Sequence, residues 1–182
     1  MPSINLDPIT LEEGYPPVDR WHPDFCGDMD LLIKANGEWI HEGSAIKREK
    51  MVTLFSRILW REGNEYFLVT PAEKVRIQVE DVPFQIVRAE QIPNSAGESV
   101  WRFYTKTNDV LTLGEDCRIE LRPYQGDWMP YVSVRHGMWA NFHRNVYYQL
   151  IEEAEQVEQA QGITLQLKSA GQPHTIGTFH EI

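Results

Sequence analysis

The stretch YFLVTPAEKVRIQVEDVPFQIV, residues 66–87, is the strongest strand signal in this sequence. Residues 66–69 are apolar, and residues 75–79 alternate apolar and polar side chains as a half-buried strand does. Pro71 and Pro83 interrupt the strand pattern. Because proline cannot donate a ladder hydrogen bond inside a sheet, a bend is predicted at each of them. Residues 84–87 then resume the strand pattern. The stretch therefore predicts three strands joined by two polar turns.

The composition is that of a folded, acidic protein. The chain has 182 residues, of which 42% are hydrophobic, and a net charge of −10. An acidic chain lacks the basic face that nucleic-acid binding requires, so no nucleic-acid partner is expected. The sequence has neither a signal-peptide pattern nor a long apolar run, which predicts a cytoplasmic protein without a membrane partner. Cys26 and Cys117 do not form a CxxC zinc pattern, and two reduced thiols are favoured over a disulfide.

The residues before the central stretch predict an arm, a hairpin and a helix. Residues 1–20 contain four prolines, and we expect an extended arm that is anchored by burial of Trp21. Asn36-Gly37 predicts a hairpin turn, because both residues favour the left-handed backbone that tight hairpins need. Apolar residues recur at helical spacing over residues 45–61, which predicts a helix.

The residues after the central stretch predict a linker and a second set of elements. The segment QIPNSAGE, residues 91–98, combines Pro, Asn, Ser and Gly, and it predicts a linker between subdomains at 21–90 and 99–182. One apolar stripe over residues 138–159 predicts the longest helix. Short strands are predicted at residues 100–105, 110–113, 117–121, 131–134, 163–167 and 175–179.

The order of these elements suggests an internal duplication. Strand, strand, helix, strand, strand is predicted over residues 30–79 and again over 117–179. Residue identity between the halves is close to nil, so the prediction depends on element order alone. We therefore predict an α+β fold of two similar ββαββ-type halves. Clefts between such halves are favoured ligand sites.

Basic residues at both predicted helix starts suggest an anionic ligand. Lys47 and Arg48 open the first helix, while Arg135 precedes the second and Arg144 follows closely. A cation at a helix N-terminus is unfavourable by about 0.3–1 kcal/mol, and a bound anion reverses that cost. We predict that Arg48, Arg135 and Arg144 bind an anion. The alternative is that these side chains extend into solvent or pair with nearby acids.

The polar bends of the central stretch supply the other candidates, Thr70, Glu73, Lys74, Glu80 and Asp81. They are predicted to face the basic helix starts or to bond the ligand, with ordinary solvent-exposed turns as the alternative. The sequence lacks the glycine patterns of serine hydrolases, phosphate loops and dinucleotide-binding folds. We therefore predict no catalytic residue, no metal ligand and no defined cofactor.

Three runs of the sequence resemble the proteobacterial family called domain of unknown function 1285. They are GEWIHEGSAIKREKMVTLFSRIL (37–59), YFLVTPAEKVRIQVEDVPF (66–84) and PYVSVRHGMWANFHRNVYYQL (130–150), and the resemblance extends over about residues 16–179. It implies a domain duplication and a C-terminal half similar to pleckstrin-homology-like folds. It also implies a ligand at the domain interface, with a nucleotide-derived molecule as one candidate, in a signalling or regulatory role.

Three functions follow as expectations. The preferred one is a ligand-binding regulatory or signalling module whose partner is a small anionic ligand at the interface of the halves. The second is a hydrolase of a phosphate or acyl ester, which needs a nucleophile or metal that the sequence does not identify. The third is a protein-interaction scaffold or homodimer, which is favoured if Trp60, Trp101 and Trp128 form one exposed patch.

Overall fold

A computed structural model describes residues 4–6 and 14–180, and the chain divides into two compact units. Residues 1–3, 7–13 and 181–182 are outside the description, so the predicted arm is covered only in part. Unit 1 comprises Met1–Pro83 and His136–Met138, and unit 2 comprises Phe84–Arg135 and Trp139–Ile182. Within the described ranges, no helix is long and apolar enough to span a membrane.

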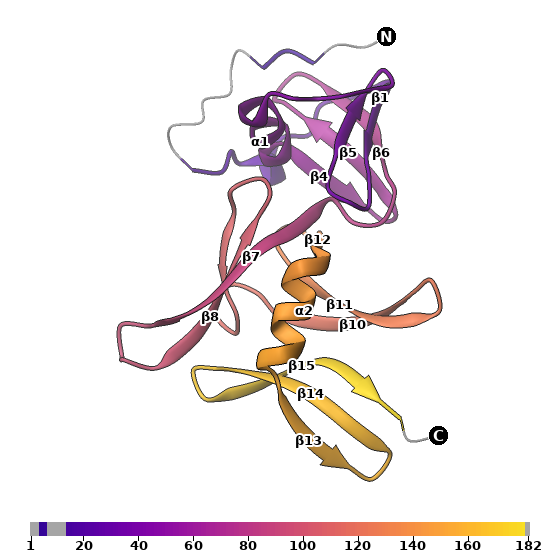
Figure 1. Ribbon diagram of the computed structural model, residues 1–182. Coiled ribbons are helices and arrows are strands. Elements are labelled where there is room, and N and C mark those ends of the chain that lie inside the picture. The colour runs from indigo at the N-terminus through magenta and orange to yellow at the C-terminus, as the bar shows by residue number, and fades with distance from the viewer. Residues whose placement is uncertain (1–3, 7–13, 181–182) are drawn as a thin grey trace. The chain divides into compact units, whose positions relative to one another are not determined.

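Unit 1 is built on a six-stranded sheet (Figure 1). The strand order is β3-β2-β1-β6-β5-β4. The central pair, β1 and β6, is parallel, and the other neighbours are antiparallel. The strands are β1 (Phe25–Ile33), β2 (Trp39–His41), β3 (Ser44–Ala45), β4 (Leu59–Glu62), β5 (Glu65–Val69) and β6 (Lys74–Val79).

The two faces of the unit 1 sheet differ in character. Helix α1 (Glu49–Arg57) packs on one face through Phe55, which stacks on Trp39 of β2 with ring centroids 6.3 Å apart. On the opposite face, the short 3-10 helix η1 (Val18–Arg20) buries Val18 against Phe67 and Val69. Trp21 packs against the same cluster and is half-buried, whereas Val18 is 2% exposed, so Val18 is the more deeply buried residue.

Unit 2 contains a second six-stranded sheet, of order β10-β11-β12-β7-β8-β9. Its central pair, β12 and β7, is again parallel. In each sheet, the first three strands in the sequence form one antiparallel piece and the last three form another. The first and the sixth strand pair in parallel and join the two pieces, so the two halves are similar in architecture. The strands are β7 (Phe84–Pro93), β8 (Ser99–Thr105), β9 (Val110–Thr112), β10 (Ile119–Tyr124), β11 (Asp127–Ser133) and β12 (Trp139–Phe142).

A helix and a small antiparallel sheet complete unit 2 (Figure 1). Helix α2 (Arg144–Glu153) precedes β13 (Glu155–Gln159), β14 (Gly162–Ser169) and β15 (Gln172–Phe179). Ser169 joins this sheet to the larger one, because its hydroxyl donates to the Leu113 carbonyl at 2.7 Å and accepts from the Trp101 N–H at 3.1 Å. Both partners belong to the β8–β9 region, so the hydroxyl is satisfied inside the core.

The α+β class is confirmed, but the ββαββ pattern is wrong. In unit 1 three strands precede α1 and three follow it, whereas α2 follows all six strands of the unit 2 sheet. The equivalent segments are therefore residues 25–79 and 84–142, not 30–79 and 117–179. A pleckstrin-homology-like C-terminal half remains a prediction.

The predicted helix over residues 138–159 is wrong at both ends. Residues 139–142 are in β12 and residues 155–159 are in β13. Trp139 and Ala140 are adjacent and both buried, which a strand achieves by placing them on opposite sides of the sheet. The predicted helix over 45–61 is likewise reduced to α1, because residues 44–45 and 59–62 pair as strands.

The predicted linker at 91–98 is a hairpin inside unit 2. Strand β7 runs to Pro93, and the Gly97 N–H donates to the Asn94 carbonyl at 3.0 Å before β8 begins at Ser99. Asn and Gly favour tight hairpin turns as well as linkers, so composition alone does not separate the two. The units divide instead between Pro83 and Phe84, with His136–Met138 assigned to unit 1.

Candidate functional site

A shallow groove of about 510 Å³ lies on unit 1. Strands β1, β5 and β6 line it, together with the β4–β5 and β6–β7 turns. The parallel pairing of β1 with β6 sets Leu32 beside Gln78 and Asp28 beside Arg76. Paired residues point to the same face of a sheet, so the polar half of the alternating pattern in β6 forms part of the groove. The polar side chains that line it are Asn64, Glu65, Arg76, Gln78 and Glu80.

Arg76 is the most constrained side chain of the groove. Its Nε and Nη2 donate to the two carboxylate oxygens of Asp28, at 2.5 and 3.0 Å, and its Nη1 donates to Glu65 Oε1 at 3.0 Å. The guanidinium also lies over the Phe25 ring, 5.3 Å from its centroid. The hydrogen bond from Arg76 lowers the pKa of Asp28 below its usual range. Arg76 is therefore positioned by two acids and one ring.

The predicted residues in and next to the β5–β6 turn bond to groups that do not line the groove. The Thr70 hydroxyl accepts hydrogen bonds from the N–H groups of Ala72 and Glu73, at 3.3 and 3.0 Å. Lys74 pairs with Glu62 at 2.6 Å. None of Thr70, Glu73 and Lys74 lines the groove.

The β6–β7 turn contributes one groove residue. Glu80 lines the groove, and its Oε2 accepts from the Ala35 N–H at 3.4 Å. Asp81 is half-buried and does not line it. Of the five candidates predicted in the central stretch, the groove thus includes only Glu80.

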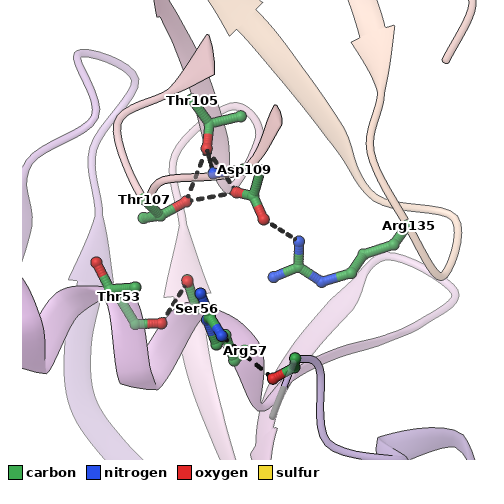
Figure 2. Close-up of polar contacts among 8 residues, drawn as sticks. Thr53, Ser56, Arg57, Thr105, Thr107, Asp109 and Arg135 are labelled. Atoms are coloured by element: carbon green, nitrogen blue, oxygen red, sulfur yellow. Dashed lines mark hydrogen bonds and ion pairs between the residues drawn. The ribbon is translucent and has the colours of Figure 1, made fainter. Parts of the chain in front are cut away.

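In unit 2, Arg135 belongs to a buried polar network (Figure 2). Its Nη1 lies 2.6 Å from Asp109 Oδ1, and the Asp109 side chain is only 2% exposed. The hydroxyls of Thr105 and Thr107 donate to Asp109 Oδ2 at 2.5 and 2.8 Å. The Arg135 guanidinium also lies over the Phe84 ring, 4.8 Å from its centroid. Arg135 therefore pairs with a nearby acid, which was the stated alternative to anion binding.

The start of α2 also differs from the prediction. Strand β12 separates Arg135 from the helix, so Arg135 does not open it. His143 caps α2, because its Nδ1 accepts from the Asn145 N–H at 3.2 Å, and Arg144 Nε donates to the Tyr148 hydroxyl at 3.0 Å. In unit 1, Arg48 is the exposed N-cap of α1 and makes no capping bond through its side chain. An arginine therefore stands at the start of each helix, Arg48 at α1 and Arg144 at α2, but Arg135 does not belong to either start.

Several residues of these two sites lie outside the sequence-based prediction. The alternation over residues 75–79 predicts β6, and reading its polar positions as one face would have identified Arg76 and Gln78. The strands predicted at residues 100–105 and 110–113 place Thr107 and Asp109 in the connection between them, but no local pattern indicates that the Asp109 carboxylate is buried. Among the described residues, no group of three or more His, Cys, Asp or Glu side chains could hold a metal ion. Burial raises the pKa of the Cys117 thiol to about 12.

Comparison with family models matches both units of the chain. Residues 16–82 match the N-terminal domain of the domain of unknown function DUF1285, and residues 83–176 match its C-terminal domain. The chain belongs to the DUF1285 family. The boundary between the two family domains coincides, within one residue, with the division between units at Pro83.

Two solved DUF1285 structures resemble the chain. A DUF1285 family protein from Silicibacter pomeroyi DSS-3 is 37% identical, with a TM-score of 0.77 over 91% of this chain and 89% of that one. A DUF1285 family protein from Shewanella baltica OS155 is 29% identical, with a TM-score of 0.55 over 69% of this chain and 92% of that one.

A more distant relative is a much larger protein. The GATOR2 complex protein WDR24 of Dictyostelium discoideum is 21% identical over 142 residues, which are 74% of this chain and 14% of that protein. The DUF1285 chain therefore spans about a seventh of the length of this relative.

Proposed function

We propose that this DUF1285 protein is a ligand-binding regulatory or signalling module whose ligand site is the groove of unit 1. The supporting observation is the groove itself. Its volume of about 510 Å³ lies within the range of about 300–1,000 Å³ that is typical of small-molecule sites. Arg76 on β6 and Glu65 on β5 are held in place before a ligand arrives, by their mutual ion pair and by Asp28.

The anionic ligand at the interface of the halves has less support than the groove. Arg135 is paired with Asp109, and Arg144 bonds to Tyr148. Arg48 retains an exposed position at the start of α1. Nucleotides therefore stay in the test panel as the competing ligand class. The proposal also keeps a pleckstrin-homology-like C-terminal half and a cytoplasmic location as its finer points.

A thermal-shift screen tests the proposal with nucleotides, phosphorylated metabolites, amines and polyols. A ligand at a hundred times its dissociation constant should stabilise the protein by about 2.7 kcal/mol. The Gln78→Ala variant should weaken this effect, since Gln78 is exposed in the groove. Gln156→Ala is the matched control, because Gln156 is exposed on β13 in unit 2. Equal stabilisation of both variants would refute the groove as the site.

The second candidate function is a protein-interaction scaffold. The matched region of WDR24 belongs to a protein described as part of the GATOR2 complex, and Trp128 at the β10–β11 hairpin is 58% exposed. The expected tryptophan patch is not formed, however, because Trp101 is 1% exposed and Trp60 packs on the Val18 cluster. Sedimentation at several concentrations tests homodimer formation. A concentration-dependent mass that Trp128→Ser abolishes would support the scaffold.

A further inference from the structure

From the charges of the groove we infer that its ligand is an organic cation bearing a primary ammonium group. This inference rests on the proposed function of the groove. The lining contains one basic residue, Arg76, and two acidic residues, Glu65 and Glu80. Asp28 adds a third carboxylate beside Arg76. The groove is therefore negatively charged at neutral pH, and it disfavours a phosphate or carboxylate ligand.

The single cation of the groove lining is already occupied. Three N–H groups of Arg76 donate to Asp28 and Glu65, so an anion would have to compete with two carboxylates for the guanidinium. Glu65 accepts from Arg76 through Oε1, and Glu80 accepts from Ala35 through Oε2. Each carboxylate has a second oxygen with which to accept from a ligand. An ammonium group, which has three donors and no acceptor, matches this set.

The neutral side chains of the groove add further acceptors. Asn64 and Gln78 are exposed and line the groove, and each amide carbonyl can accept a hydrogen bond from an N–H donor. Two carboxylates with two amides suit a ligand that has spaced amino groups, such as a diamine. The net charge of −10 raises the local concentration of cations around the whole protein.

A divalent metal is a poorer fit to the same acids. In the described part of the chain, no three His, Cys, Asp or Glu side chains come together in a metal-binding group. Divalent cations such as Ca²⁺ need about six or more oxygen ligands at short distances. An organic ammonium instead forms a few directional hydrogen bonds to acceptors spread along the groove.

Isothermal titration calorimetry with putrescine, AMP and magnesium chloride tests the inference. We expect putrescine to bind and AMP and Mg²⁺ not to bind in the groove. The double variant Glu65→Gln, Glu80→Gln should weaken putrescine binding at least tenfold, because it keeps the side-chain shapes and removes both charges. The matched control is Glu152→Gln, Glu158→Gln, which makes the same charge change at exposed positions of unit 2. This control should change the affinity less than twofold.

The outcomes separate the ligand class from the groove. Putrescine binding that both double variants weaken equally would overturn the inference, because non-specific attraction to the acidic surface would explain it. The side-chain amide signals of Asn64 and Gln78 in a nitrogen-15 NMR spectrum report on the groove directly. If AMP shifts these signals and putrescine does not, the inference of a cationic ligand is wrong, but the proposed function of the groove stands. Shifts from none of the panel ligands would overturn both.

Discussion

Removing either member of the Asp109–Arg135 pair is expected to destabilise unit 2 by several kcal/mol. The Asp109 side chain is 2% exposed and the Arg135 side chain is 14% exposed. Truncating one partner of a buried ion pair costs about 3–5 kcal/mol, because the other charge stays buried without its counterion. Asp109→Asn and Arg135→Met are suitable variants, since both approximately preserve side-chain size.

The magnitude of the coupling can be estimated from the geometry. Two unit charges about 4 Å apart attract by about 4 kcal/mol at an effective dielectric constant of about 20. In the Asp109→Asn variant the amide oxygen can still accept from Thr105 and Thr107, so part of the network survives. The double variant leaves neither charge uncompensated. Its destabilisation should therefore be smaller than the sum of the two single changes by about 2–3 kcal/mol.

Hydrogen exchange detected by mass spectrometry measures the local loss of stability in each variant, and the coupling between Asp109 and Arg135 follows from these values. Peptides over β8–β9 report on the network, and peptides over β5–β6 in unit 1 serve as the internal reference. The control cycle uses Lys168→Met and Glu155→Gln, because this pair is 3.2 Å apart with both side chains 56% exposed. Such exposed pairs couple by about 0–1 kcal/mol. A coupling between Asp109 and Arg135 no larger than that of the control would refute the reasoning.

Three further predictions concern unit 2 and the thiols. Burial lowers the pKa of His174 from its ordinary value of 6.5, so the unfolded chain gains this proton first and stability falls as the pH drops below about 6.5. His174→Gln should flatten that part of a urea-midpoint profile, and an unchanged slope would contradict it. A Cβ at Gly162, where φ is +139°, would lie 2.0 Å from the Phe179 carbonyl oxygen. Gly162→Ala should therefore lower Tm by about 4–8 °C, for a cost of about 2 kcal/mol, and an unchanged Tm would be inconsistent with this packing. Because burial raises the pKa of Cys117 to about 12 while Cys26 is exposed, a thiol reagent at pH 8 should modify Cys26 at least about a hundredfold faster. Equal rates would argue against the buried position of Cys117.

The sequence correctly predicted those strands and turns whose conformation is determined by residues next to one another in the chain. Alternation over residues 75–79 identified β6, and Asn36-Gly37 identified the turn between β1 and β2. Both signals are complete within a few residues, so tertiary structure does not alter them. The same local reading misassigned residues 91–98, because a long hairpin and a linker use the same turn residues.

The misassigned helix at residues 138–159 has a different cause. Its apolar positions satisfy a helical stripe, yet Trp139 and Ala140 pair with β11 and β7. Periodicity records which residues are buried and not which element buries them. A strand, a helix and a strand in succession can therefore produce one continuous stripe. The error also explains why Arg135 was expected to precede a helix when it precedes a strand.

The parallel pairing of β1 with β6 links the fold to the candidate site. Five elements separate these strands in the sequence, and no local pattern encodes their contact. Their register places Asp28 opposite Arg76, so the acid that holds Arg76 comes from a distant part of the unit 1 sequence. The groove could consequently be inferred only in part, from the polar face of β6 and from Glu80. The sequence pointed to an anionic ligand through the basic residues at the predicted helix starts, whereas the proposed cationic ligand follows from acids that separate segments of unit 1 bring to the groove.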